Sequence, residues 1–105
     1  MPTDNNVKKQ IKRVITKTDS SALAILFGSR ARGNAKTDSD WDILILLNRE
    51  QVSIKDEQLF RHNLYDLELE IGMPISTFVY SLHDWKNKLS NTPLHKSVEQ
   101  EGVML

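Results

Sequence analysis

The chain has 105 residues, a length that suits one domain with one core, so we expect a single domain over residues 1–105. Hydrophobic residues make up 39% and charged residues 27%, which argues against global disorder, and a formal net charge of zero disfavours nucleic acid or a membrane surface as the partner. The absence of cysteine excludes disulfides and thiolate metal sites, and no apolar stretch suits a signal peptide or a membrane span, so we expect a cytoplasmic protein.

The first third of the chain predicts a helix and two buried strands. Apolar residues at helical spacing, with basic residues between them, predict an amphipathic helix over residues 4–18, with Asp4 as its N-cap. We interpret the basic face of this helix as solvated. "ALAILF" (22–27) predicts a buried strand that ends at Gly28, a short helix follows from Ser29 to Ala31, and "WDILILLN" (41–48) predicts a strand buried on both faces.

The remainder of the chain alternates between helices and one more strand. Residues 54–71 fit both a helix and an alternating strand, and their length and good helix formers favour a helix that ends at Gly72. We expect a strand over 74–81, a short helix over 82–89, a helix that starts at Thr92-Pro93 and stops at Gly102, and an apolar tail that docks on the body. This order predicts an α/β or α+β fold, a small mixed sheet with helices packed on it.

The segment "GSRARGNAKTDSDWD" (28–42) carries the residues suited to chemistry. Side chains alternate along a strand, so Asp40 and Asp42 share one side and Trp41 points to the core. Two adjacent carboxylates repel unless a cation lies between them, and Mg²⁺ commonly binds through one or two carboxylates plus phosphate oxygens. Upstream, Gly28 and Ser29 suit a phosphate-binding turn, and Arg30 and Arg32 add positive charge.

The stretch "LFGSRARGNAKTDSDWDILILL" resembles the signature of the minimal nucleotidyltransferases of the DNA polymerase beta superfamily. That signature is an apolar strand, Gly-Ser, a loop, and Asp-x-Asp leading into a second apolar strand. The resemblance implies that Gly28 and Ser29 bind a nucleoside triphosphate, with ATP favoured, and that Asp40 and Asp42 hold Mg²⁺. It further implies transfer of a nucleotidyl group such as AMP to a hydroxyl, and an antitoxin role beside a small helical partner protein of the HEPN type.

The sequence departs from the family pattern at the position of the third carboxylate. Active members carry a third carboxylate on the next strand, and here the expected position falls near Ser76. Glu68 and Glu70 could substitute only if their segment were a strand, while Asp84 is interpreted as a helix-start residue. His62, His83, His95 and Trp85 are assigned structural or solvent roles.

The sequence therefore leaves three hypotheses open. The first is a nucleotidyltransferase-like protein that binds a nucleoside triphosphate with Mg²⁺ and transfers a nucleotidyl group. The second is a domain that keeps the fold but has lost the reaction and acts through protein contacts, which the missing third carboxylate favours. The third is a structural α/β domain with a chance motif, which would place Asp40 and Asp42 far from Ser29.

Overall fold

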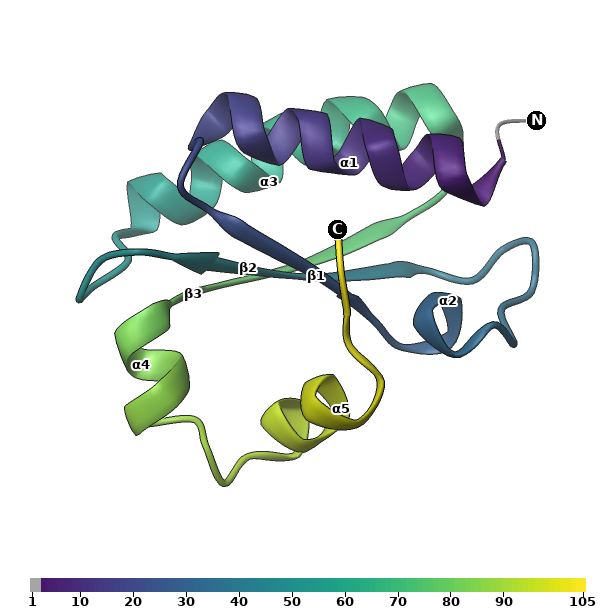
Figure 1. Ribbon diagram of the computed structural model, residues 1–105. Helices are drawn as coiled ribbons and strands as arrows, with labels where there is room; N and C mark the ends of the chain where they lie inside the picture. Colours follow the sequence, from purple (N-terminus) through teal and green to yellow (C-terminus); the bar gives the residue numbers. More distant parts are fainter. Residues whose placement is uncertain (1–2) are drawn as a thin grey trace.

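The computed structural model describes residues 3–105, which form a four-stranded mixed sheet with helices on both faces (Figure 1). In chain order the elements are α1 (Asp4–Thr18), β1 (Leu23–Phe27), α2 (Ser29–Arg32), β2 (Trp41–Leu47), α3 (Ile54–Ile71), β3 (Ile75–Ser81), α4 (Leu82–Asn87), α5 (Pro93–Glu101) and β4 (Val103–Met104). The predicted fold class is confirmed. Between residues 3 and 105, none of the helices has the length and apolar character needed to cross a bilayer.

The sheet brings the ends of three strands to one place. Its strand order is β3-β2-β1-β4, with β2 parallel to β3 and β1 antiparallel to both β2 and β4. In this register Asp42 at the start of β2 lies opposite Phe27 at the end of β1, and opposite Ser76 near the start of β3. The sequence segments that follow β1 and precede β2 and β3 therefore meet at the same end of the sheet.

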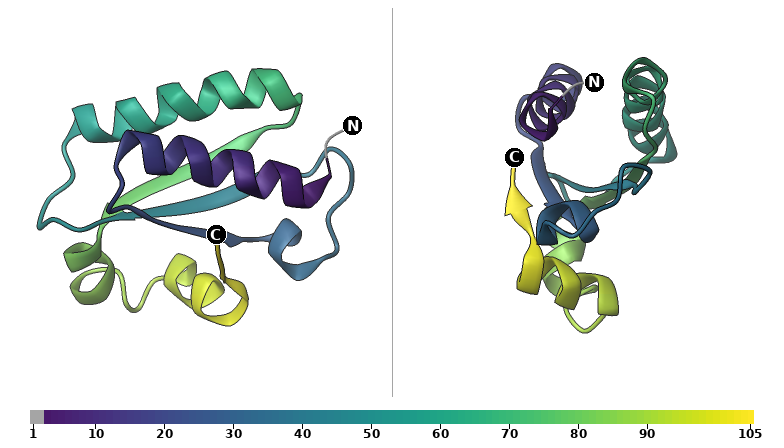
Figure 2. Two further views of the ribbon diagram at one scale, coloured as in Figure 1. Left: turned by 45° about the horizontal axis from the view of Figure 1, so that its top comes forward. Right: turned by 90° about the vertical axis from the view of Figure 1, so that its right-hand side faces the viewer.

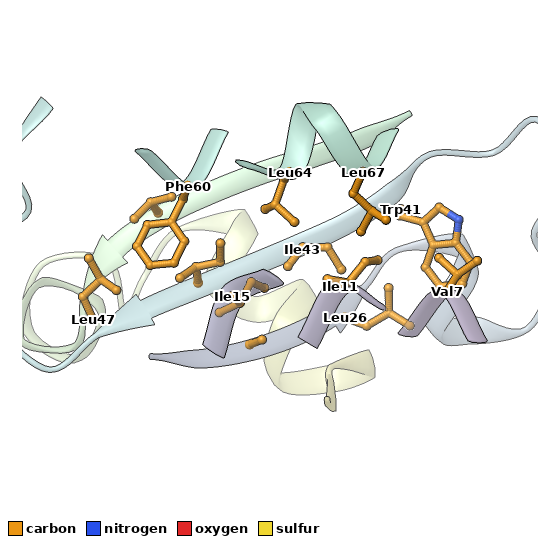
Figure 3. Packing of buried hydrophobic residues seen from close by; sticks show 13 residues of the cluster. Val7, Ile11, Ile15, Leu26, Trp41, Ile43, Leu47, Phe60, Leu64 and Leu67 are labelled. Atoms are coloured by element: carbon orange, nitrogen blue, oxygen red, sulfur yellow. The ribbon is translucent and has the colours of Figure 1, made fainter. Parts of the chain in front are cut away.

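The larger core lies between the sheet and the helices α1 and α3, which run side by side across one face (Figure 2). Apolar side chains of both helices pack against Trp41, Ile43 and Leu47 of β2, as Figure 3 shows. The most deeply buried side chains of this cluster are Val7, Ile11, Ile15, Leu26, Trp41, Ile43, Ile45, Leu47 and Leu64. Trp41 is fully buried here, so its predicted core role is confirmed.

The opposite face of the sheet is covered by α4 and α5 (Figure 1). Their cluster joins Phe27 and the even-numbered residues Leu44 and Leu46 to Trp85 of α4. Trp85 stacks on His95 of α5 with ring centroids 4.6 Å apart, which links the two short helices. The structural roles predicted for Trp85 and His95 are confirmed, and β2 is buried on both faces as expected.

Helix ends follow local side-chain chemistry. The predicted N-cap at Asp4 is wrong: Thr3 is the cap, because its side chain accepts a hydrogen bond from Asn6 N–H, and Asp4 lies in the first turn, where its charge favours the helix dipole. The ambiguous segment is helical. It begins with a reciprocal capping box between Ser53 and Asp56 and ends at Gly72, as predicted.

The apolar tail docks on the body, as expected, but it does so as strand β4. Met104 pairs with Ile25 and Val103 with Leu26, so the last residues extend the sheet beyond β1. The Leu105 N–H also donates to Ala24 C=O over 2.9 Å. Two residues carry no pattern that distinguishes a strand from an irregular segment, and the backbone groups along the edge of β1 decide their conformation.

Candidate functional site

The site lies at the end of the sheet where β1 ends and β2 and β3 begin. Asp42 is half-buried at the start of β2, and Asp40 is exposed two residues earlier. The Ser76 hydroxyl of β3 donates to Asp40 Oδ2 over 3.1 Å. Asp42 also lies opposite the last residue of β1, next to Gly28. The sheet thus brings together the two aspartates, the Gly-Ser turn and the position expected for a third carboxylate.

Gly28 permits the closest approach in the site. Its backbone has φ +75° and ψ −161°, a conformation that residues with a side chain rarely adopt. A Cβ at this position would lie 2.1 Å from Asp42 Oδ2. Glycine is therefore required for two reasons, the turn itself and the space taken by the Asp42 carboxylate.

Helix α2 begins at Ser29, directly after this glycine. Gly28 C=O accepts from the N–H groups of Ala31 and Arg32, over 3.0 and 3.1 Å, which closes the turn around the glycine carbonyl. In such a turn the first N–H groups have no partner within the helix. Ser29 therefore adds a hydroxyl and N–H donors next to Gly28, the residue that lies against the Asp42 carboxylate, a combination that suits phosphate oxygens beside a bound cation.

The Asp42 carboxylate is electrostatically strained. Its partial burial raises its pKa above the ordinary value, and the negative charges of Asp40 and Glu101 raise it further, while Arg32 lowers it. The anionic form is thus penalised in the protein alone. A cation placed against Asp40 and Asp42 would relieve this penalty, which is the arrangement expected of a metal-binding carboxylate pair.

Comparison with known protein families decides which class of protein uses this geometry. Residues 9–105 match the family described as "Polymerase beta, Nucleotidyltransferase", nearly the whole chain. The chain belongs to the polymerase beta nucleotidyltransferase family. The resemblance inferred from the sequence is therefore confirmed.

Individual relatives match either part of this chain or its fold. It is 35% identical over 54 residues to "Protein adenylyltransferase MntA" of Aphanizomenon flos-aquae (strain 2012/KM1/D3), a match over 51% of this chain but only 36% of that protein. The fold is similar to a crystal structure of a toxin-antitoxin with AMP-PNP, with a TM-score of 0.67 and 20% identity, over 94% of this chain and 71% of that one. A mutant of the toxin-antitoxin MntA-HpeT gives a TM-score of 0.66 at 18% identity, over 93% and 70% of the two chains.

Nucleotidyltransferases of this family generally use a divalent metal ion, and the site offers hard oxygen donors for one. Asp40 and Asp42 would hold the ion, with the Ser76 hydroxyl as a neutral oxygen beside them. Within residues 3–105 there is no cluster of three or more acidic, histidine or cysteine side chains with metal-binding geometry. Two carboxylates and one hydroxyl are hard oxygen donors, which suit a divalent cation that takes its remaining ligands from elsewhere.

The alternative carboxylates named in the sequence do not reach the aspartate pair. Glu68 and Glu70 lie on helix α3, which excludes the strand on which their proposed role depended. Glu68 accepts from Ile75 N–H over 2.6 Å, at the first residue of β3. Asp84 lies in the first turn of α4 after the Ser81 cap, as predicted. None of these three residues therefore supplies the third carboxylate, and Ser76 occupies its expected position beside the aspartates.

The two arginines of α2 have separate roles. Arg30, predicted to bind phosphate, turns away from the site: its buried guanidinium donates to the carbonyls of Thr37 and Ser39 and lies over the Trp41 ring, 4.8 Å from the centroid. It orders the loop that leads into the aspartate pair, and its role in binding phosphate stays a prediction. Arg32 stays at the site, where its charge lowers the pKa of Asp42.

A residue missed by the sequence reasoning completes the site. Glu101, the last residue of α5, accepts from Gly28 N–H over 3.2 Å and forms a 2.8 Å ion pair with Arg32. These contacts lower the pKa of the Glu101 carboxyl, the Arg32 hydrogen bond most of all. No spacing rule could have found this residue, because 73 positions separate it from Gly28.

Proposed function

We propose that this protein binds a nucleoside triphosphate, ATP in the first instance, together with Mg²⁺ and transfers its nucleotidyl group to a hydroxyl on an acceptor protein. The observation that carries the proposal is the contact between the Gly28 turn and the Asp42 carboxylate. The turn at Gly28, with its N–H donors, lies directly against the Asp42 carboxylate. A divalent cation bound to Asp40 and Asp42 would therefore also contact a polyphosphate held by this turn.

In the proposed reaction an acceptor hydroxyl oxygen forms a bond to the α-phosphorus, and the bond from that phosphorus to the bridging oxygen of the β-phosphate breaks. Pyrophosphate leaves, and the hydroxyl proton passes to a carboxylate of the pair or to water. The divalent ion, when bound, supplies charge stabilisation for the attacking and leaving oxygens. Ser29 and the N–H groups of its turn hold phosphate, Arg32 neutralises it, and Ser76 positions Asp40 through its hydrogen bond.

The name of one relative, an adenylyltransferase, supports AMP as the transferred group. The toxin-antitoxin structures support a partner protein, and one of them contains AMP-PNP. We therefore propose that the acceptor is a toxin partner, a small helical protein of the HEPN type, and that this chain serves as its antitoxin. Because the matched segment covers about a third of the adenylyltransferase, this assignment stands as a proposal for the present chain.

Calorimetric titration tests the binding step directly. We expect ATP and AMP-PNP to bind in the presence of MgCl₂ and to bind at least about tenfold more weakly in EDTA, because polyphosphate then meets uncompensated carboxylates. Incubation with labelled ATP and candidate partner proteins would follow transfer. An affinity unaffected by the removal of metal would contradict the proposed role of Asp40 and Asp42.

A second candidate function is a domain that binds nucleotide or partner without turnover, which Ser76 favours because a serine is a poor base. The variant Ser76→Asp separates the two candidates. If the missing carboxylate limits turnover, Ser76→Asp should raise the transfer rate by about tenfold or more. A third acidic group beside Asp40 should also lower the melting temperature in EDTA, with recovery in MgCl₂. Recovery by metal without any gain in transfer would support the binding-only function.

A further inference from the structure

Glu101 takes the hydrogen-bond donors that a phosphate group would need. Both of its carboxylate oxygens are engaged: Oε1 accepts from Gly28 N–H over 3.2 Å, and Oε2 pairs with Arg32 Nη1 over 2.8 Å. A backbone N–H beside a glycine turn and an arginine are typical partners of phosphate oxygens as well as of carboxylates. The carboxylate of α5 therefore stands in the place of an anionic ligand.

The charge of Glu101 opposes the binding of polyphosphate at the same place. Glu101 and Asp40 both act on Asp42 as negative charges that raise its pKa, and Arg32 acts in the opposite sense. A triphosphate placed on the same Gly28 N–H would add further negative charge within direct contact of the Glu101 carboxylate. Since Arg32 is half-exposed, its side chain is free to leave Glu101 and follow a phosphate.

The backbone after Glu101 holds the Glu101 side chain at the site, but only through a short edge strand. Gly102 packs so tightly that a Cβ would lie 2.4 Å from Val98 C=O, and the next residues pair with β1 as β4. The two residues of β4 are both exposed, and the strand lies at the edge of the sheet (Figure 2, right). Edge strands with so few pairings open at low cost, so the segment 101–105, here called the latch, can detach from β1 while the buried part of α5 stays packed on the sheet.

We propose that Glu101 is an internal occupant of the phosphate position, and that nucleotide binding displaces it and loosens the segment 101–105. This inference rests on the proposed function, since it concerns the same nucleotide. It assigns the segment a regulatory role. Interactions that stabilise the pairing of β4 with β1 would lower the affinity for nucleotide, and interactions that release the segment would raise it. By thermodynamic linkage, docking of the latch lowers the affinity for nucleotide by the same factor by which bound nucleotide lowers the equilibrium constant for docking.

The test compares Glu101→Gln and Glu101→Ala with the wild-type chain by titration with ATP and MgCl₂. We expect both variants to bind ATP about tenfold more tightly, because the competing anion is gone. Glu99→Gln is the matched control: it removes the same charge from the exposed side of the same helix and should leave the affinity within about twofold. Melting temperatures would establish that each variant is folded.

The second measurement is amide hydrogen exchange with and without ATP and MgCl₂. We expect the amides of residues 103–105 to exchange faster when nucleotide is bound, while those of β2 stay protected. Weaker binding by Glu101→Gln would overturn the proposal and assign Glu101 to the metal or nucleotide instead. Unchanged affinity would also overturn it. If the wild-type chain and both Glu101 variants all fail to bind, the proposed nucleotide function itself is refuted.

Discussion

Asp42→Asn is expected to abolish the part of the ATP affinity that depends on Mg²⁺, and to lower nucleotidyl transfer by about 100-fold or more. The substitution keeps the shape of the side chain but removes the charge that would hold the cation. At the same time it removes the repulsion with Asp40 and the penalty of burying a carboxylate. The melting temperature in the absence of metal should therefore stay unchanged or rise. Titration calorimetry and thermal unfolding on the same sample measure both effects.

Asp38→Asn is the matched control for this experiment. Asp38 lies in the same loop, two residues before Asp40, and is exposed. Its substitution changes the net charge equally but leaves the pair intact, so ATP affinity should remain within about twofold of the wild-type value. Wild-type binding of Mg²⁺ and ATP by Asp42→Asn, or an equal loss in both variants, would contradict the metal-binding role of Asp42.

Gly28→Ala is expected to disable the site and to destabilise the fold. The added Cβ would collide with Asp42 Oδ2, so the carboxylate must move from the position that faces the Ser29 turn. The positive φ adds a conformational cost of about 1–3 kcal/mol for a residue with a side chain. We expect a loss of ATP binding together with a lower free energy of unfolding, measured by urea denaturation.

Gly33→Ala separates the collision from the backbone cost. Gly33 also has a positive φ, at +80°, but nothing lies within 4 Å of where its Cβ would be. It should lose about 1 kcal/mol of stability and retain ATP binding. The double variant Gly28→Ala with Asp42→Ala should recover part of the stability lost by Gly28→Ala, because it removes the colliding oxygen. Additive losses in the double variant would contradict the steric account.

The two proposals have one electrostatic origin. The charges of Asp40 and Glu101 both act on Asp42, and Arg32 opposes them, so the site carries excess negative charge where an anionic nucleotide is proposed to bind. Binding of polyphosphate requires that this charge be neutralised or removed. A dication on the aspartates does the first, and release of Glu101 does the second. The variants Asp42→Asn and Glu101→Gln are therefore expected to shift ATP affinity in opposite directions, although each removes one negative charge.

Much of the fold could be predicted because it is encoded in local patterns. The helices over residues 4–18 and 54–71 follow from apolar residues at helical spacing, and the buried strand of residues 41–47 follows from its continuous apolar run. The alternation of side chains correctly placed Trp41 in the core, with Asp42 facing the other way. The Thr3 cap was missed because a threonine and an aspartate side by side are both good caps, and the backbone decides between them.

By itself the sequence determined the order of the elements from α1 to α5, the carboxylate pair and the Gly-Ser turn, because each depends on residues that are close along the chain. The tertiary structure alone decided that Gly28 touches Asp42, that Arg30 turns to the loop and Trp41, and that Glu101 occupies the turn beside Arg32. These contacts arise from strand pairing and helix packing between distant segments. Their partners carry no shared spacing that a pattern could detect, so only the folded chain brings them together.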